Sequence, residues 1–131
     1  MVAEIEFQRA LYTKLSGLGL TVYDVAPQAK DGASLATFPY VEIGSLITSE
    51  WDTSTEDGFS VLARIHTRSR SGSTYEARTI QGQIYAALHN AELTITGQNR
   101  VLIMREMSDL TRQPDGSFHG VCEYRALIET A

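Results

Sequence analysis

The stretch Asp57–Asn90, DGFSVLARIHTRSRSGSTYEARTIQGQIYAALHN, decides the fold, because its hydrophobic period changes part-way along. From Gly58 to Ser69 the side chains alternate, with Leu62 as the exception. One face receives Phe59, Val61, Ala63 and Ile65, and the other receives Ser60, Arg64, His66 and Arg68. A period of two is typical of a strand with one buried face. The pattern therefore predicts one long strand over 58–69.

A short polar turn, RSRSGS at 68–73, precedes a helical period. The apolar positions then fall on one stripe of a helix: Ala77, Ile80, Ile84, Ala87, Leu88 and Ala91. Ser73 and Glu76 have the S-x-x-E spacing of a capping box, in which each side chain bonds the other residue's backbone N–H. We expect the helix to begin near Ser73.

The composition predicts a single globular domain over residues 1–131. The net charge of −5 argues mildly against bulk nucleic-acid binding, which normally needs a basic face. The single cysteine, Cys122, forms no disulfide within the chain, which fits a reducing compartment or indifference to redox state. Acidic residues near the N-terminus do not resemble a signal peptide, and no apolar run is long enough to span a membrane. We expect assembly in the cytoplasm.

The first half of the chain predicts one helix and two strands around a loop. Residues 3–16 form the helix, 21–26 a short strand stopped by Pro27, 28–37 a loop, and 38–49 a second strand. The helix buries Phe7, Ala10, Leu11, Leu15 and Leu18. In the second strand Val41, Ile43 and Ile47 share a face, opposite Tyr40, Glu42 and Gly44.

The second half predicts strands at 93–95, 100–108 and 117–129, with a proline–glycine turn at 112–116. The last strand places Phe118, Cys122, Tyr124, Ala126 and Ile128 on one face. The order is therefore α-β-β-β-α-β-β-β. Short connections between strands favour an α+β fold, with a single mostly antiparallel sheet and two helices packed on one face.

The sequence shows no constellation of catalytic, cofactor-binding or metal-ligating residues. His66, His89 and His119 are far apart in the chain, and each is better interpreted as an ordinary surface histidine. Cys122 is predicted to be a buried structural thiol rather than a nucleophile. An anion could bind the helix start at 71–73, but a plain cap is the simpler interpretation. We expect no enzyme activity and no cofactor.

Two charged segments are candidate protein-interaction sites. A basic row, Arg64, His66, Arg68 and Arg70, follows one face of the long strand. An acidic loop over 50–57 contains Glu50, Trp51, Asp52, Glu56 and Asp57. Either segment could be a solvated surface, with Trp51 folded back on the core. Alternatively, the row contacts an acidic partner or passing DNA, and the loop docks through Trp51, because tryptophan is enriched at interface centres.

The succession of several segments resembles a known family. These segments are Val22–Pro27, Phe38–Gly44, Trp51, Thr55–Gly58, Ala86–His89 and His119–Leu127. Together, over about residues 3–129, they resemble the tail-completion or tail-terminator proteins of long-tailed bacteriophages, prophages and gene transfer agents. Order and spacing carry this resemblance, since none of the segments is a catalytic motif.

The resemblance implies a structural protein of the virion neck. Such a protein forms a homo-oligomeric ring, typically a hexamer, on the head-proximal end of the tail tube. The ring ends tube polymerisation and joins the tail to the head-closure connector, and DNA passes through it without specific binding. The implied partners are further copies of the chain, the tail tube protein and the connector, with no membrane.

The acidic loop and the basic row would then contribute contacts of opposite sign, and reversing Arg64 and Arg68 to Glu should impair assembly without unfolding the monomer. The sequence leaves open a small ligand-binding or partner-binding module outside any virion. A regulatory or toxin-associated domain also stays open.

Overall fold

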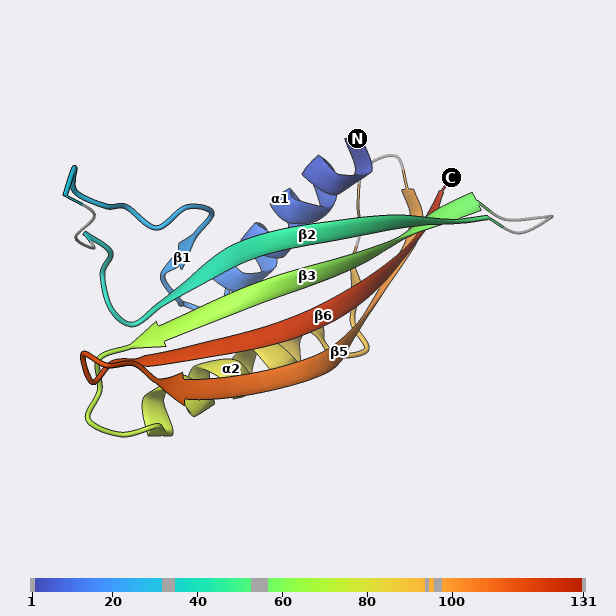
Figure 1. Cartoon of the computed structure of the whole chain (residues 1–131). Helices are drawn as coiled ribbons and strands as arrows, with labels where there is room; N and C mark the ends of the chain where they lie inside the picture. Colours follow the sequence, from blue (N-terminus) through green and yellow to red (C-terminus); the bar gives the residue numbers. More distant parts are fainter. Residues whose placement is uncertain (1, 32–34, 53–56, 94, 96–97, 131) are drawn as a thin grey trace.

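The computed structural model describes residues 2–31, 35–52, 57–93, 95 and 98–130 (Figure 1). Within these residues the elements follow the predicted order. They are α1 (Val2–Ser16), β1 (Val22–Tyr23), β2 (Tyr40–Asp52), β3 (Asp57–Ser69), α2 (Tyr75–Leu88), β4 (Glu92–Leu93), β5 (Gln98–Arg112) and β6 (Phe118–Thr130).

The described strands form one six-stranded sheet in the order β1-β2-β3-β6-β5-β4. Every neighbouring pair is antiparallel except β1 and β2, which are parallel. The sheet is strongly curled, and in Figure 1 both helices lie on its far side. The predicted α+β class and the mostly antiparallel sheet are confirmed. In the part of the chain that the structure describes, one face of the sheet is therefore covered by helices, and the other face, which we call the open face, has no covering layer.

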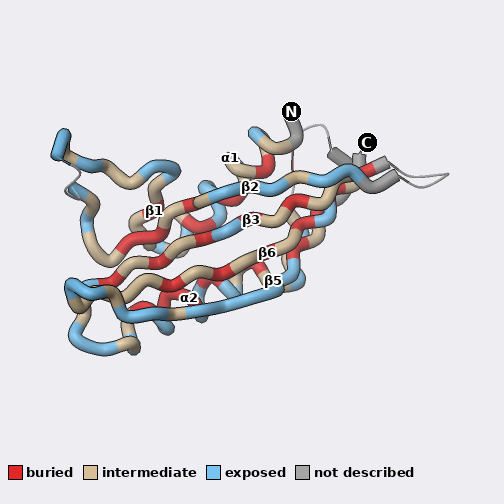
Figure 2. Tube along the Cα trace, viewed as in Figure 1, coloured by how far each residue is buried: buried red, intermediate tan, exposed pale blue. Residues whose placement is uncertain are grey.

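The alternation in β3 and β6 has the predicted effect on burial (Figure 2). Val61, Ala63 and Ile65 of β3 are at most 1% exposed, and β6 buries the inward residues Cys122, Tyr124, Ala126 and Ile128 equally well. The predicted burial of Cys122 is confirmed. Burial raises the pKa of Cys122, so this thiol stays protonated at neutral pH.

Both helices pack apolar stripes onto the same core. In α1 the buried residues are Phe7, Leu11 and Leu15, with Ala10 and Leu18 partly buried against them. In α2 they are Ala77, Ile80, Ile84 and Leu88. At about 1.5–3 kcal/mol for each large apolar side chain, this burial is the main favourable contribution to docking of the helices.

The predicted capping box at the start of α2 is wrong. The helix begins at Tyr75, and its N-cap residue, Thr74, makes no side-chain cap hydrogen bond. Glu76 instead accepts a hydrogen bond of 2.6 Å from the hydroxyl of Ser69, at the end of β3. The Ser69–Glu76 hydrogen bond replaces the expected bond from Glu76 to the backbone of Ser73. Ser69 is fully buried, so its hydroxyl needs a partner within the protein.

The prediction that Ile47 shares a face with Val41 and Ile43 is also wrong. Val41 and Ile43 are buried, but Ile47 is 55% exposed. The register of β2 against β3 shifts between Ile43 and Leu46. Such an irregularity reverses the face on which every later side chain lies, so Leu46 packs on the core and Ile47 lies on the open face.

Several element boundaries differ from the predictions. The strand expected at 21–26 has only two residues, and of the acidic loop expected over 50–57, residues 50–52 belong to β2 and Asp57 belongs to β3. These two strands form a long hairpin, whose residues 53–56 lie outside the described part of the chain. Strand β5 reaches Arg112 rather than 108, because pairing with β6 continues to that residue.

Candidate protein-interaction surface

The open face of the sheet carries most of the predicted basic row. Arg64, His66 and Arg68 point to this face from β3, since their neighbours at odd positions point into the core. Arg70 follows just after the strand ends at Ser69. The predicted arrangement of the row on one polar face is therefore confirmed for the three residues in β3.

Arg64 already has a partner within the chain. Its guanidinium lies 3.1 Å from the carboxylate of Glu123, the residue opposite it on β6, and its side chain is 44% exposed. Exposed ion pairs of this kind contribute about 0–1 kcal/mol. Arg64 is thus less available for an acidic partner than a row of free cations would suggest.

His66 and His119, which the sequence interpretation treated as separate surface residues, form a pair. Nδ1 of His66 lies 2.8 Å from Nε2 of His119, and the rings stack with centroids 5.0 Å apart. Gly44 leaves room for this arrangement, because a Cβ there would lie 2.6 Å from Nε2 of His66. Only the pairing of β3 with β6, in which Arg68 lies opposite His119, brings the two rings together. Knowing that register would have revealed the pair.

The pair is kept largely neutral by its surroundings. Burial lowers the pKa of both imidazoles, and Arg68 lowers both further. Arg64 also lowers the pKa of His66, and His66 that of His119. Glu42 opposes the shift at both rings, as Asp109 does at His119. One neutral ring must accept the shared hydrogen bond, which agrees with the direction of these shifts.

We predict that the protein loses stability as the pH falls from 7 towards 5. Below the ordinary histidine pKa the unfolded chain binds protons at both rings, whereas the native state binds them only at lower pH. The free energy of unfolding should therefore decrease over this interval. Urea denaturation at pH 7 and pH 5 measures the loss. It should be smaller in a His66→Gln/His119→Gln variant, and an equal loss in both proteins would contradict this assignment.

Arg68 and Arg70 border a hollow of about 370 Å³ at the end of the open face. Its lining includes Phe38, Tyr40, Glu42, Arg68, Arg70 and Asp115. We call this hollow the basic-end pocket. The guanidinium of Arg70 lies 3.8 Å from the centroid of the Phe38 ring, a cation–π contact. Among the described residues no carboxylate forms an ion pair with Arg68 or Arg70.

Further along the same face, large apolar side chains are exposed on three strands, β2, β6 and β5. The exposed fractions are 55% for Ile47, 40% for Met104, 37% for Met107 and 37% for Leu127, with half-buried Leu62 between them. We call these five residues the apolar patch. Registers place Ile47 opposite Leu62, and Met104 opposite Arg125, which in turn lies opposite Leu62. This patch is not visible in the sequence, because finding it requires the strand order and the register shifts in β2 and β5.

The predicted acidic loop lies at the other end of the β2–β3 hairpin. Glu50 is exposed on β2 opposite Phe59, and the register pairs Trp51 with Gly58 and Asp52 with Asp57. The side chains of Trp51, Asp52 and Asp57 lie outside the described part of the structure, as does all of Glu56. The docking role of this loop stays a prediction.

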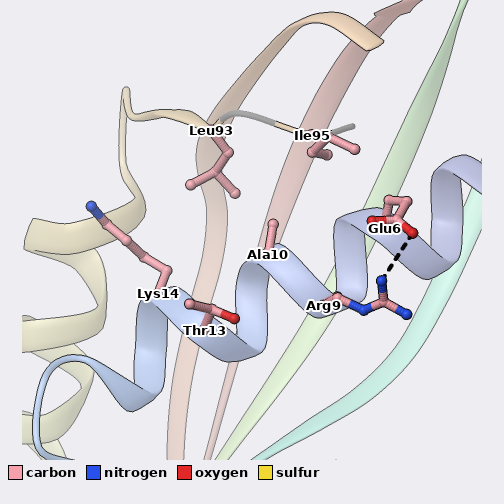
Figure 3. A pocket seen from close by; sticks show the side chains of 7 residues that line it. All are labelled: Glu6, Arg9, Ala10, Thr13, Lys14, Leu93 and Ile95. Carbon is pink, nitrogen blue, oxygen red and sulfur yellow. Dashed lines mark hydrogen bonds and ion pairs between the residues drawn. The ribbon is translucent and has the colours of Figure 1, made fainter. Parts of the chain in front are cut away.

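Another hollow, of about 350 Å³, lies between α1 and the segment around β4 (Figure 3). Ala10 and Thr13 face Leu93 and Ile95 there, and an ion pair of 3.2 Å joins Arg9 to Glu6 at one end. Within the described residues, no group of three potential metal ligands occurs. No described helix is long and apolar enough to cross a membrane.

Comparison with known proteins decides the family. The sequence pattern of the family described as "Tail completion protein gp17" matches residues 9–129, which is nearly the whole chain. The chain belongs to the tail completion protein gp17 family. The resemblance seen in the sequence is confirmed, and the protein is a structural tail protein rather than a member of a known enzyme family.

Solved structures show the fold of this tail completion protein elsewhere. A chain from the structure titled "Virion of native gene transfer agent (GTA) particle" is 20% identical and has a TM-score of 0.80, with 97% of each chain covered. A second solved chain is 11% identical with a TM-score of 0.57, and the match covers 99% of this chain and 94% of that one. No curated protein matches the sequence.

Proposed function

We propose that this tail completion protein forms a homo-oligomeric ring at the neck of a virion or gene transfer agent. The ring caps the head-proximal end of the tail tube, ends tube polymerisation and joins the tail to the head-closure connector. Its partners are copies of itself, the tail tube protein and the connector. A hexamer is the expected stoichiometry, and DNA passes through the ring without specific binding.

One observation of the structure supports this function most directly, and it is the apolar patch on the open face. Soluble monomers seldom leave large apolar side chains grouped on adjacent strands, and such groups mark interaction surfaces. The patch is part of a rigid sheet, which suits a contact made by shape complementarity. Family membership supports a role in the tail. The patch is a surface through which copies can associate.

The charged groups of the open face are already paired within the chain. The ion pair of Arg64 with Glu123 lies beside the patch and that of Arg125 with Glu106 lies within it, at 3.1 and 2.9 Å. Arg125 also donates a hydrogen bond of 2.6 Å to Ser60. Because these charges have partners, covering the patch leaves no lone charge buried. We therefore assign the open face to the contact between neighbouring copies.

An assay in which tail tube protein polymerises in vitro tests this proposal. Adding the tail completion protein should stop tube growth, and electron microscopy should show a ring at one end of each tube. A matched reaction with bovine serum albumin controls for crowding. Unchanged tube lengths and bare tube ends in the presence of folded protein would rule out the proposed function.

A further inference from the structure

The two ends of the β2–β3 hairpin differ in charge. At the end where β2 turns into β3, the eight residues 50–57 include four acids, Glu50, Asp52, Glu56 and Asp57. At the opposite end, β3 finishes with Arg68, and Arg70 follows directly. We call the first end the acidic tip, defined as residues 50–57. The hairpin therefore has an acidic end and a basic end.

The basic-end pocket holds two guanidinium groups, those of Arg68 and Arg70, together with the carboxylates of Glu42 and Asp115. Its own carboxylates are already engaged: Glu42 accepts a hydrogen bond of 2.7 Å from the backbone N–H of Ala26. Asp115 accepts bonds of 2.9 and 2.6 Å from the backbone and hydroxyl of Ser117. Arg68 is half-buried and, within the described residues, has no hydrogen bond or ion pair. The guanidinium of Arg70 lies over the Phe38 ring, and its charge contributes to lowering the pKa of Asp115.

The acidic tip of the same molecule lies too far away to reach this pocket. Strand β3 has 13 residues and pairs along its whole length with β2 or β6. At about 3.3 Å per residue, Arg68 and Asp57 are separated by roughly 35 Å of rigid hairpin. Any contact between tip and pocket must therefore join two molecules.

We propose that the basic-end pocket receives the acidic tip of a second copy of this chain. The inference rests on the proposed ring, and it specifies which surface of one copy contacts which surface of the next. Carboxylates of the tip bind Arg68 and Arg70, since guanidinium groups bind carboxylates through two parallel hydrogen bonds. The pocket and the apolar patch both lie on the open face, joined along β3 from Leu62 to Arg68. The proposed contact therefore places a neighbour on the same face of the sheet as the patch.

Such a contact uses different surfaces on the two copies, so it is heterologous. Contacts of this type close into rings when the rotation between copies allows it, whereas a two-fold contact stops at a dimer. The acidic tip and the basic-end pocket therefore give each copy one donor and one acceptor site for its two neighbours. Two acidic tips would repel each other, so the charges also disfavour the reversed arrangement, in which two tips meet.

Disulfide trapping tests the contact even when association is transient. In a Cys122→Ala background, one protein carries Thr53→Cys in the tip, and a second carries Gln28→Cys at the edge of the pocket. The control places Gln83→Cys on the exposed face of α2. Under mild oxidation at low salt, the tip should cross-link to residue 28 about tenfold more than to residue 83, the ratio that 1.4 kcal/mol of contact energy gives.

Charge reversal then identifies the groups responsible. Arg68→Glu/Arg70→Glu in the pocket protein should abolish the cross-link, and Glu50→Lys/Asp57→Lys in the tip protein should restore it. A milder Arg68→Gln/Arg70→Gln variant, checked by circular dichroism, guards against unfolding and should lower the yield without abolishing it. Equal cross-linking to residues 28 and 83, or a yield insensitive to the reversal, would overturn the proposal.

The tube-length assay separates this inference from the proposed function. If wild-type protein caps tubes while the cross-link is absent, the ring stands and the tip–pocket contact is wrong. If the cross-link forms and responds to charge while tubes stay uncapped, the contact stands and the capping role is wrong.

Discussion

Replacing Leu127 with glutamate should abolish ring formation and leave the monomer folded. Leu127 lies on the open face of β6, between Ser60 of β3 and Leu102 of β5, and is 37% exposed in the monomer. In a contact between copies it would be buried, and an unpaired carboxylate there costs several kcal/mol. A penalty of about 3 kcal/mol weakens each contact more than a hundredfold. In the monomer the new carboxylate stays in water, so the free energy of unfolding should change by less than about 1 kcal/mol.

Native mass spectrometry measures ring formation, and urea denaturation measures the free energy of unfolding of the monomer. Leu35→Glu is the matched control, because it makes the same substitution at a side chain that is 62% exposed and lies in the loop before β2. The control should assemble like the wild type. Rings formed by the Leu127→Glu protein, or equal loss of assembly in the control, would show that the apolar patch is not the contact.

The sequence predicted the fold because each long element carries its own period. The alternation in 58–69 and the apolar stripe after residue 76 are local signals, and both appear in the structure as β3 and α2. Two local inferences failed because the packing of strands and helix overrode the local pattern. Ser69 at the end of β3 donates a hydrogen bond to Glu76, which therefore takes no part in the expected capping box, and the register shift in β2 places Ile47 on the open face. Neither outcome follows from the spacing of residue types alone.

The candidate site was only partly predictable for the same reason. The basic row was visible because its residues alternate along one strand. The His66–His119 pair joins residues 53 positions apart, and the apolar patch combines side chains of four strands, so both depend on which strands are neighbours. Loops between strands allow several strand orders, and the observed order places β6 between β3 and β5. A surface assembled across strands therefore needs the register as well as the pattern.

Replacing Ile84 with alanine should destabilise the fold more than any surface change considered above. Ile84 is fully buried at the centre of α2, in the core formed with the sheet. Removing its three outer carbons leaves a cavity that close-packed neighbours fill only partly. The free energy of unfolding should fall by about 2–5 kcal/mol. For a chain of 131 residues this loss lowers the melting temperature by roughly 8–20 °C.

Gln83→Ala is the control for this substitution, since Gln83 is exposed on the same helix and both residues become the same good helix former. Urea denaturation followed by circular dichroism should give the control a free energy of unfolding within about 0.5 kcal/mol of the wild type. A loss below about 1 kcal/mol for Ile84→Ala would mean that α2 packs loosely on the sheet. The open face would then lack the rigid support that a contact based on shape requires, and both the ring and the tip–pocket contact would lose their structural basis.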